Sequence, residues 1–382
     1  MAEFSREFLN NRLFTDNALT YDDMCTERRG IPENTGVEYK ENGDVVLRLW
    51  APDAKEVVIK SFNDTFACEN HEGLFECTIP YDEKATGPRM VIPYVDGNET
   101  LYPWFPVYWT MNRPVNYVEI PDHAFEFCMA QDVPHGALIR EMFWAECMGN
   151  YERCIVYTPP GYMKGTEEYP VLYLQNGGTD NEICWEYSGR MSQTMDNLIA
   201  AGKAKPFIVV MCNTMLRFGG KVKNQRDLGY ETMLIESCIP YIEANYRVKT
   251  DKWNRAIAGL SMGAYMTNDI GLRHPELFGS VGGFTASMTT TEHWEVYERP
   301  YPAVMAAAKQ DIRTFADNYR LFFRSTTRQE NHFEFFEADD RLCEESGIAA
   351  LDCYHRVVYE DRTSKWSSWR QGFRDFACLV FR

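Results

Sequence analysis

A serine between two glycines, at the end of an apolar run, constrains the fold of this chain more than any other feature. Residues 254–264 read Asn-Arg-Ala-Ile-Ala-Gly-Leu-Ser-Met-Gly-Ala, which places Ser261 in a GxSxG frame. The run 256–258 predicts a short buried strand, and residues 262–272 continue with helical periodicity. A strand, a tight turn and a helix around such a serine are typical of a nucleophile elbow, where small neighbours leave the hydroxyl uncrowded. Ser261 is therefore the candidate nucleophile, against the alternative of an ordinary glycine-rich turn.

The length and charge of the chain limit its organisation and its partners. With 382 residues, the chain suits two domains, one of them large. Asp and Glu together number 56 against 39 Lys and Arg, so the formal net charge is -17. This charge repels phosphate backbones and anionic membranes, which argues against nucleic acid and membrane partners and favours a neutral ligand.

Cysteines and the N-terminus bear on metal binding and compartment. The twelve cysteines form no CxxC pairs or Cys/His clusters, and several lie in apolar runs such as 209–213 and 376–380. They predict reduced core thiols, with no disulfide framework and no metal site. No signal peptide begins the sequence, and no run approaches the roughly 18 apolar residues of a membrane span. We expect a cytoplasmic protein, although the mature form of a secreted protein would look the same; the oligomeric state stays open.

The first third of the chain is predicted to be all-β. After an N-terminal extension over residues 1–36, short strand patterns alternate with turns over 37–121. The expected strands are 45–50, 56–59, 74–79, 90–92 and 117–120. This spacing predicts a small β-sandwich.

From 126 to 382 the pattern changes to strands separated by helices. The expected strands are 169–174, 207–211, 256–258, 280–281, 321–323 and 354–359. The expected helices are 191–202, 231–245, 262–272, 335–345 and 367–377. This alternation predicts an α/β domain with a mostly parallel sheet and helices on both faces.

Several motifs in order resemble carbohydrate esterase family 1. They are Tyr-Thr-Pro-Pro-Gly-Tyr at 157–162, Tyr-Pro-Val-Leu-Tyr-Leu-Gln-Asn-Gly-Gly at 169–178, the helical run 237–247, and Ala-Gly-Leu-Ser-Met-Gly at 258–263. The resemblance covers nearly all of residues 130–382. It implies the α/β-hydrolase fold and a serine esterase that needs no cofactor and acts on feruloyl or acetyl esters of xylan.

The all-β part has a resemblance of its own. Residues 47–57 and 94–97 resemble the immunoglobulin-like module that precedes many such esterases and is related to glycogen-type carbohydrate-binding modules. The resemblance implies that a carbohydrate or an acylated oligosaccharide is the partner.

Ester cleavage by serine requires amide donors for the oxyanion. The elbow supplies the backbone N–H of Met262, and the resemblance implies a second donor from Gly177 or Gly178, although the glycine pair could also be a plain turn. The family usually has histidine where this chain has Asn176. That change could alter the support of the loop without removing the backbone donors.

The acid and the base depart from the family pattern. Glu330 stands where the family has an acidic residue after a strand, and a solvated surface glutamate is the alternative. The family's histidine would fall at Ser364, and no histidine follows His355, which lies in an expected strand. His293 and His332 lie in or near predicted loops, so either could substitute as the base.

Aromatic residues in the expected loops could stack on sugars or hydroxycinnamoyl rings. The candidates are Trp185, Trp366 and Phe218, with core packing as the alternative. In the sandwich, the aromatic run 101–109 could be a sugar platform, although a buried domain interface is the favoured interpretation.

Two functions therefore remain open. In the first, Ser261 attacks an acyl ester and a substitute base activates it. In the second, a degenerate esterase binds glycan without efficient turnover, because losing a triad member costs on the order of 10⁴ to 10⁶ in turnover.

Overall fold

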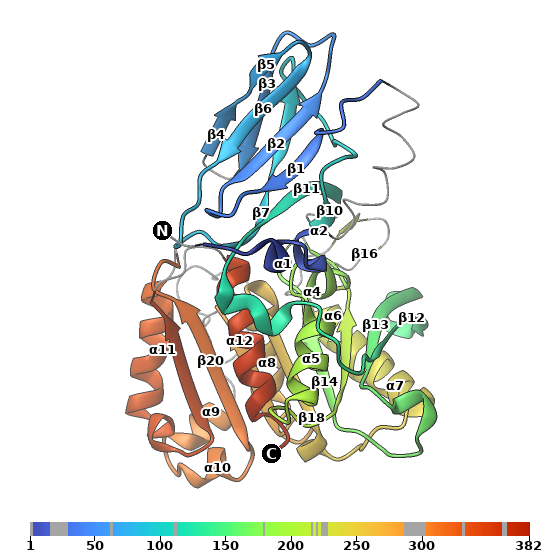
Figure 1. Ribbon diagram of the computed structural model, residues 1–382. Helices are drawn as coiled ribbons and strands as arrows, with labels where there is room; N and C mark the ends of the chain where they lie inside the picture. Colours follow the sequence, from blue (N-terminus) through green and yellow to red (C-terminus); the bar gives the residue numbers. More distant parts are fainter. Residues whose placement is uncertain are drawn as a thin grey trace. The chain divides into compact units, whose positions relative to one another are not determined.

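The computed structural model describes most of the chain as two compact units (Figure 1). Unit 1 comprises Met1–Gln131 with Arg362–Ser367, and unit 2 comprises Asp132–Asp361 with Ser368–Arg382. The described residues are 3–15, 30–61, 64–110, 113–178, 180–214, 217–218, 221–222, 228–285, 303–330, 333–360 and 365–382.

Unit 1 is built from small antiparallel sheets. The strand orders are β1-β2-β6-β5, β4-β3-β8-β9 and β10-β11-β7. The strands are β1 Gly36–Tyr39, β2 Val45–Trp50, β3 Val57–Ser61, β4 Asp64–Ala67, β5 Glu69–His71, β6 Leu74–Ile79, β7 Gly87–Met90, β8 Ile92–Val95, β9 Asn98–Glu99, β10 Val107–Thr110 and β11 Arg113–Ile120. Two short helices, α1 Arg6–Leu9 and α2 Arg12–Thr15, precede them. The expected strands 45–50 and 74–79 coincide with β2 and β6, because their inward residues alternate clearly.

Three rings of the aromatic run 101–109 belong to the interior of unit 1. Tyr102, Trp104 and Phe105 are buried in its hydrophobic core, with the rings of Tyr102 and Phe105 4.9 Å apart. An open sugar platform at these three rings is therefore wrong, since none of them offers a face to a ligand.

Unit 2 contains one eight-stranded sheet of order β12-β13-β15-β14-β18-β19-β20-β21. β12 and β13 are antiparallel to their neighbours, and the strands from β15 to β21 are parallel. Their bounds are β12 Ala137–Ala145, β13 Asn150–Thr158, β14 Val171–Gln175, β15 Ile208–Cys212, β18 Arg255–Leu260, β19 Ser280–Phe284, β20 Leu321–Thr327 and β21 Tyr354–Tyr359. A separate pair, β16 Arg217–Phe218 and β17 Lys221–Val222, forms a two-stranded sheet.

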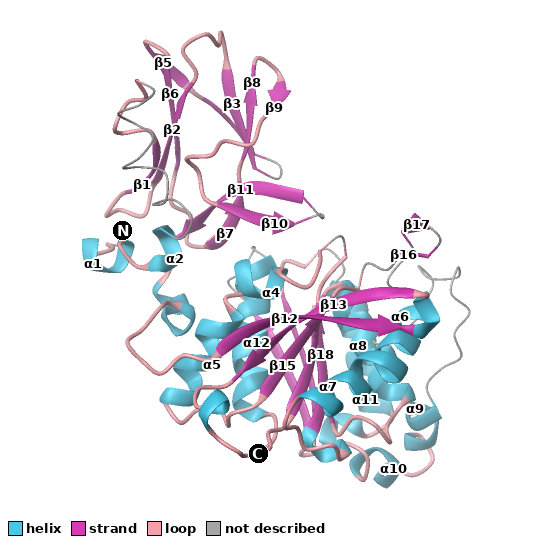
Figure 2. Ribbon diagram, turned by 90° about the vertical axis from the view of Figure 1, so that its right-hand side faces the viewer, coloured by secondary structure: helices cyan, strands magenta, loops and turns pink. Residues whose placement is uncertain are grey.

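Helices cover both faces of the large sheet (Figure 2). They are α4 Cys184–Tyr187, α5 Met191–Ala200, α6 Leu228–Met233, α7 Ile239–Asn245, α8 Met262–Arg273, α9 Ala303–Ala308, α10 Arg313–Ala316, α11 Phe333–Glu345 and α12 Lys365–Leu379. Because both faces are covered, every residue of β14, β15, β18 and β19 is buried. The predicted α/β domain with a mostly parallel sheet is confirmed.

The expected helix 231–245 is interrupted. A π-helical segment, Leu234–Cys238, separates α6 from α7, and Pro240 follows in the first turn of α7. Proline has no N–H to donate within a helix, so a widened turn just before it accommodates the missing hydrogen bond.

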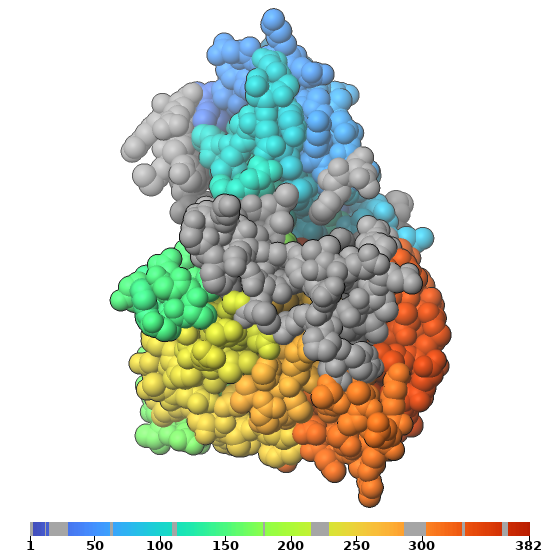
Figure 3. Space-filling model, turned by 180° about the vertical axis from the view of Figure 1, so that it is seen from behind, coloured from blue at the N-terminus to red at the C-terminus, as the bar shows by residue number. Residues whose placement is uncertain are grey.

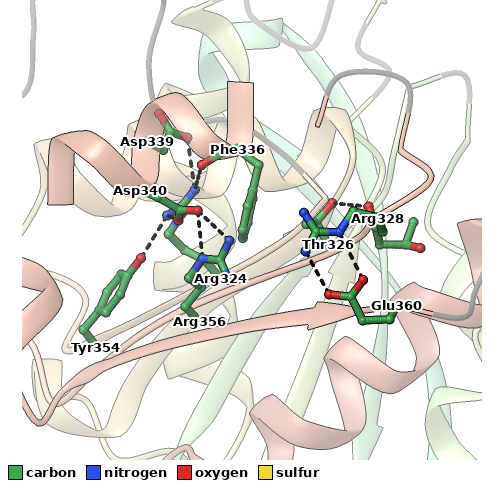
Figure 4. Close-up of polar contacts among 10 residues, drawn as sticks. Arg324, Thr326, Arg328, Phe336, Asp339, Asp340, Tyr354, Arg356 and Glu360 are labelled. Atoms are coloured by element: carbon green, nitrogen blue, oxygen red, sulfur yellow. Dashed lines mark hydrogen bonds and ion pairs between the residues drawn. The ribbon is translucent and has the colours of Figure 1, made fainter. Parts of the chain in front are cut away.

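A buried ion network joins α11 to the last two strands (Figure 4). The Arg324 guanidinium of β20 contacts Asp339 at 3.4 Å and Asp340 at 2.8 Å, and it donates to the Phe336 carbonyl at 3.0 Å. Burial by itself lowers the pKa of Arg324, but the Asp339 carboxylate and the other acidic groups around it together outweigh burial, so the net shift is upward and the guanidinium stays charged. The network therefore ties the middle of α11 to β20.

Most of the cysteines in the described part of the chain are buried. All cysteines there are free thiols, and the Sγ atoms of Cys212 and Cys238 lie 3.3 Å apart in the core. Among the same residues, no helix combines the length and the apolar character that crossing a bilayer requires.

Candidate active site

Ser261 occupies a strained turn between β18 and α8. Its backbone has φ 50° and ψ -121°, a conformation that side-chain-bearing residues rarely adopt. The Ser261 N–H donates to the Phe284 carbonyl at 2.9 Å, while the Ser261 carbonyl accepts from Ala264 and Tyr265 at 3.0 and 3.1 Å. These bonds hold the turn in place, and the side chain remains half-buried at the mouth of the elbow.

Both glycines of the motif are required by backbone contacts. A Cβ built on Gly263 would lie 2.2 Å from the Asn176 carbonyl oxygen, and one on Gly259 would lie 2.7 Å from the Gly263 carbonyl oxygen and 2.7 Å from the Gln175 Cβ. The end of β14 therefore touches the first turn of α8 with no room for a side chain between them.

The loop after β14 lies beside the serine. Gln175 pairs with Gly259 in the sheet, so the parallel register continues toward Gly177 and Ser261. A Cβ on Gly177 would lie 3.6 Å from the Ser261 Cβ, and one on Gly178 would lie 3.1 Å from the Met262 Cγ. The structure thus brings together the elbow and the glycine pair that the sequence predicted for the oxyanion.

The two glycines differ in their surroundings. Gly177 is buried, and its carbonyl accepts from the Asn176 side chain at 2.9 Å. Gly178 is half-buried, and among the described residues its N–H meets no acceptor. Met262 is half-buried as well, and it is the first residue of α8, at the positive end of the helix dipole. Gly178 and Met262 are therefore the better pair of donors for an anionic oxygen.

Asn176 supports this loop, which the sequence alone did not show. Its Oδ1 accepts from the Thr214 N–H at 3.2 Å, and its Nδ2 donates to the Gly177 carbonyl at 2.9 Å. Beneath it, the Gln175 side chain accepts from the buried Tyr230 hydroxyl. Burial raises the pKa of Tyr230 well above its ordinary value, so the phenol stays a neutral donor.

Glu330 follows β20 at the same edge of the sheet. Leu260 pairs with Phe284, and Phe284 with Ser325, so the level of Ser261 corresponds to Thr326. Glu330 comes four residues after that level, in a turn where its N–H donates to the Thr327 carbonyl at 3.1 Å. Two strand spacings of about 4.8 Å separate β18 from β20, which leaves room for a base between Ser261 and the carboxylate.

An ion pair joins the two loops at this edge. Arg328, next to the end of β20, contacts Glu360, next to the end of β21, at 2.9 Å (Figure 4).

The described histidines of unit 2 lie away from Ser261. His71 and His123 belong to unit 1. His135 contacts Asp196 at 2.9 Å, near the edge where the parallel strands begin, and His274 contacts Glu231 at 2.7 Å beyond the far end of α8.

The sheet register also excludes His355 as the base. His355 pairs with Phe323 and is therefore level with Ala258, three residues below Ser261. Roughly 10 Å along the strands and roughly 14 Å across three strand spacings separate it from the elbow. His293, His332 and Ser364 lie outside the described residues.

The predicted stacking residues need correction. Trp185 is 1% exposed, donates from Nε1 to the Gln175 carbonyl at 2.9 Å, and packs against Phe284 and Phe373. It supports the loop from below and offers no face to a ligand, so its assignment as a stacking residue is wrong. Trp366, in the first turn of α12, is 8% exposed and is likewise buried. The side chain of Phe218 lies outside the described part.

Comparison with known proteins identifies the family. Residues 145–376 match the family described as "Putative esterase". The chain belongs to this esterase family. The match spans the elbow, the glycine loop and the strands up to α12, which are the parts that form the site.

Two curated relatives share part of this region. The endo-1,4-beta-xylanase/feruloyl esterase of Xylanibacter ruminicola is 38% identical over 266 residues, which are 65% of this chain and 36% of the relative. Esterase Rv1288 of Mycobacterium tuberculosis is 34% identical over 124 residues, which are 29% of this chain and 24% of that protein. The chain thus spans only about a third or less of the length of these relatives.

Solved structures share the fold. The ferulic acid esterase of Anaeromyces mucronatus in complex with ferulic acid has a TM-score of 0.55 at 20% identity and covers 68% of this chain and 96% of its own. The enterobactin esterase of Shigella flexneri has a TM-score of 0.61 at 14% identity, and the match covers 90% of this chain and 95% of the esterase. Unit 2 is an α/β-hydrolase, and the second match extends beyond it into unit 1. Whether unit 1 is a carbohydrate-binding module stays a prediction.

The backbone contact at the elbow can be tested with Gly263→Ala. The added methyl group collides with the Asn176 carbonyl, so we expect a loss of about 1–3 kcal/mol in the free energy of unfolding, typical of overpacking. Displacing the loop by about 1 Å also lowers aryl-ester hydrolysis by about 10²-fold.

Gly165→Ala is the matched control, because a Cβ there would meet only the Gly161 carbonyl oxygen at 3.4 Å. Urea unfolding and ester hydrolysis of both variants give the comparison. Equal behaviour of the two variants would contradict the close approach.

Proposed function

We propose that the protein hydrolyses feruloyl or acetyl esters of xylan with Ser261 as the nucleophile. The observation that carries the proposal is the strained backbone of Ser261, beside the Gly177–Gly178 pair that follows β14. A side-chain-bearing residue in such a conformation costs on the order of 1–3 kcal/mol, a cost that characteristically occurs at functional sites.

The residues support a two-step mechanism. The Ser261 hydroxyl attacks the ester carbonyl carbon, and the resulting oxyanion accepts hydrogen bonds from the Met262 and Gly178 amides. The base takes the hydroxyl proton and delivers it to the leaving sugar oxygen, which leaves an acyl group on Ser261. Water then attacks the acyl-enzyme by the same route and releases the free acid.

For the base we propose His332, with Glu330 as the acid that orients it. Hydrolases of this fold carry their triad in the chain order serine, acid, histidine, and His332 follows Glu330 by two residues. Glu330 lies at the catalytic edge of the sheet, near Arg328 and its ion pair with Glu360. His293 precedes Glu330 in the chain and is the second candidate.

The substrate class rests on the relatives and on charge. The relative with 38% identity is named as a xylanase/feruloyl esterase, and one structural neighbour was solved with ferulic acid. A feruloyl or acetyl ester on xylan is neutral at the reacting group, which suits a chain of net charge -17.

Hydrolysis of methyl ferulate and of an aryl acetate tests the proposal. Wild type is expected to turn over both esters, and Ser261→Ala is expected to lose about 10⁴-fold or more, because the nucleophile is gone. If wild type and Ser261→Ala are equally inert while a xylo-oligosaccharide raises the melting temperature, the protein binds glycan without turnover.

The same assay assigns the base. His332→Gln should reduce kcat by about 10⁴-fold on methyl ferulate, whereas His293→Gln should stay within about twofold of wild type. The reverse order of effects would make His293 the base, and no effect from either variant would sink the assignment.

A further inference from the structure

Exposed apolar side chains gather on the hairpin of β12 and β13. Among the described residues, the large hydrophobic side chains with high exposure are Leu101, Leu138, Met142, Trp144, Tyr151 and Met163, and four of these six lie on this hairpin. The hairpin projects from the side of unit 2 (green in Figure 3). Such clustering on a soluble surface is typical of a binding site.

Three of the four line up at the tip of the hairpin. Trp144 pairs directly with Tyr151, and Met142 pairs with Arg153, so all four side chains share one face. The Trp144 and Tyr151 rings are 49% and 58% exposed and meet edge to face at 5.3 Å. We call Met142, Trp144, Tyr151 and Arg153 the aromatic ledge.

The Trp144 ring is held in a fixed orientation. Its Nε1 donates to the Glu146 carboxylate at 2.7 Å. The edge-to-face contact with Tyr151 restrains the other side of the indole. A ring that is already ordered loses little conformational entropy when a ligand binds, so the ledge is prepared for a ligand.

The ledge lies at the same sheet edge as Ser261. Cys154 of β13 pairs with Cys212 of β15. The pairing of β15 with β14, and of β14 with β18, places Cys212 level with Gln175 and Gly259. Tyr151 is three residues beyond that level and Ser261 two residues beyond it. Three strand spacings, roughly 14 Å, separate β13 from β18.

A direct contact links the ledge to the site loop. Arg153 Nε lies 3.3 Å from Glu182 Oε1, and Glu182 lies in the segment that begins with the Gly178 amide. Before Glu182 in the same segment, the Asp180 N–H donates a hydrogen bond to the Gly177 carbonyl. Arg153 of the ledge therefore contacts the segment that follows the glycine pair.

The chemistry of the ledge fits a neutral glycan chain. Aromatic faces stack on the apolar C–H faces of sugars, and the flanking Arg153 guanidinium can donate to hydroxyl groups. A net charge of -17 on each copy opposes self-association through so small a patch, and it also opposes an acidic partner. A neutral polysaccharide carries no such penalty.

We propose that the aromatic ledge binds the main chain of a neutral xylan polysaccharide, a few sugar units away from the esterified sugar at Ser261. This inference rests on the proposed esterase function and adds that the substrate is an oligomeric or polymeric chain. The ledge holds the chain while the acyl group enters the elbow.

The test combines binding and hydrolysis in Trp144→Ala, Tyr151→Ala and the double variant. Met163→Ala is the matched control, because Met163 is 71% exposed and follows β13 at the opposite edge of the sheet. Xylohexaose is the probe for calorimetric binding. Methyl ferulate and a feruloylated arabinoxylan oligosaccharide are the substrates.

The double variant is expected to bind xylohexaose about tenfold more weakly than wild type, which corresponds to about 1.4 kcal/mol. Its kcat/KM on the feruloylated oligosaccharide should fall about tenfold through KM, while methyl ferulate stays within about twofold. Met163→Ala should match wild type in both measurements.

Unchanged binding of xylohexaose by the double variant, or no binding by wild type, would overturn the inference. A wild-type dimer in light scattering that the double variant abolishes would instead make the ledge a self-association surface. If no variant hydrolyses methyl ferulate, the proposed function fails, and the binding comparison still decides the role of the ledge.

Discussion

The contact between the end of β14 and the first turn of α8 is the constraint on which the rest of the site depends. Backbone meets backbone there, since neither Gly259 nor Gly263 leaves space for a Cβ. Such a contact has no flexible side chain to absorb movement, so it sets the distance between the Gly178 and Met262 amides. It also explains why the strain at Ser261 persists, because the turn cannot relax without separating two buried strands.

The register of the sheet then brings the remaining groups to one edge. Glu330 follows β20 and the aromatic ledge begins β13, and both reach the edge at which Ser261 stands. The Arg328–Glu360 pair restrains the loop that carries the acid. In this account the sheet positions the chemistry and the loops supply the specificity, as is usual for folds of this class.

The central strands and helices could be predicted from the sequence because their burial is nearly complete. The expected 207–211 strand is shifted by one residue from the fully buried β15, and the expected 262–272 helix differs from α8 by a single residue at its end. The strands β12 and β13 were not expected, since the exposed part of this hairpin carries charged and apolar residues without a clean pattern of hydrophobicity.

The site was only half visible in the sequence. Spacing alone predicts Ser261 and the glycine pair, because both depend on local backbone chemistry. The spacing cannot decide whether Gly177 or Gly178 donates to the oxyanion, because that choice depends on which of the two residues is buried. The assignment of Trp185 as a stacking residue was wrong, because its ring turns inward beneath the loop. The base depends on contacts between distant segments, and no local pattern encodes these.

The most direct test of the central claim is covalent labelling with an organophosphonate, followed by peptide mass spectrometry. A nucleophile poised at a formed elbow should take up one phosphonyl group per chain, on the peptide that contains Ser261, and Ser261→Ala should take up none. An adduct on another residue, or an unlabelled wild-type protein under conditions that label a known serine esterase fully, would contradict the account.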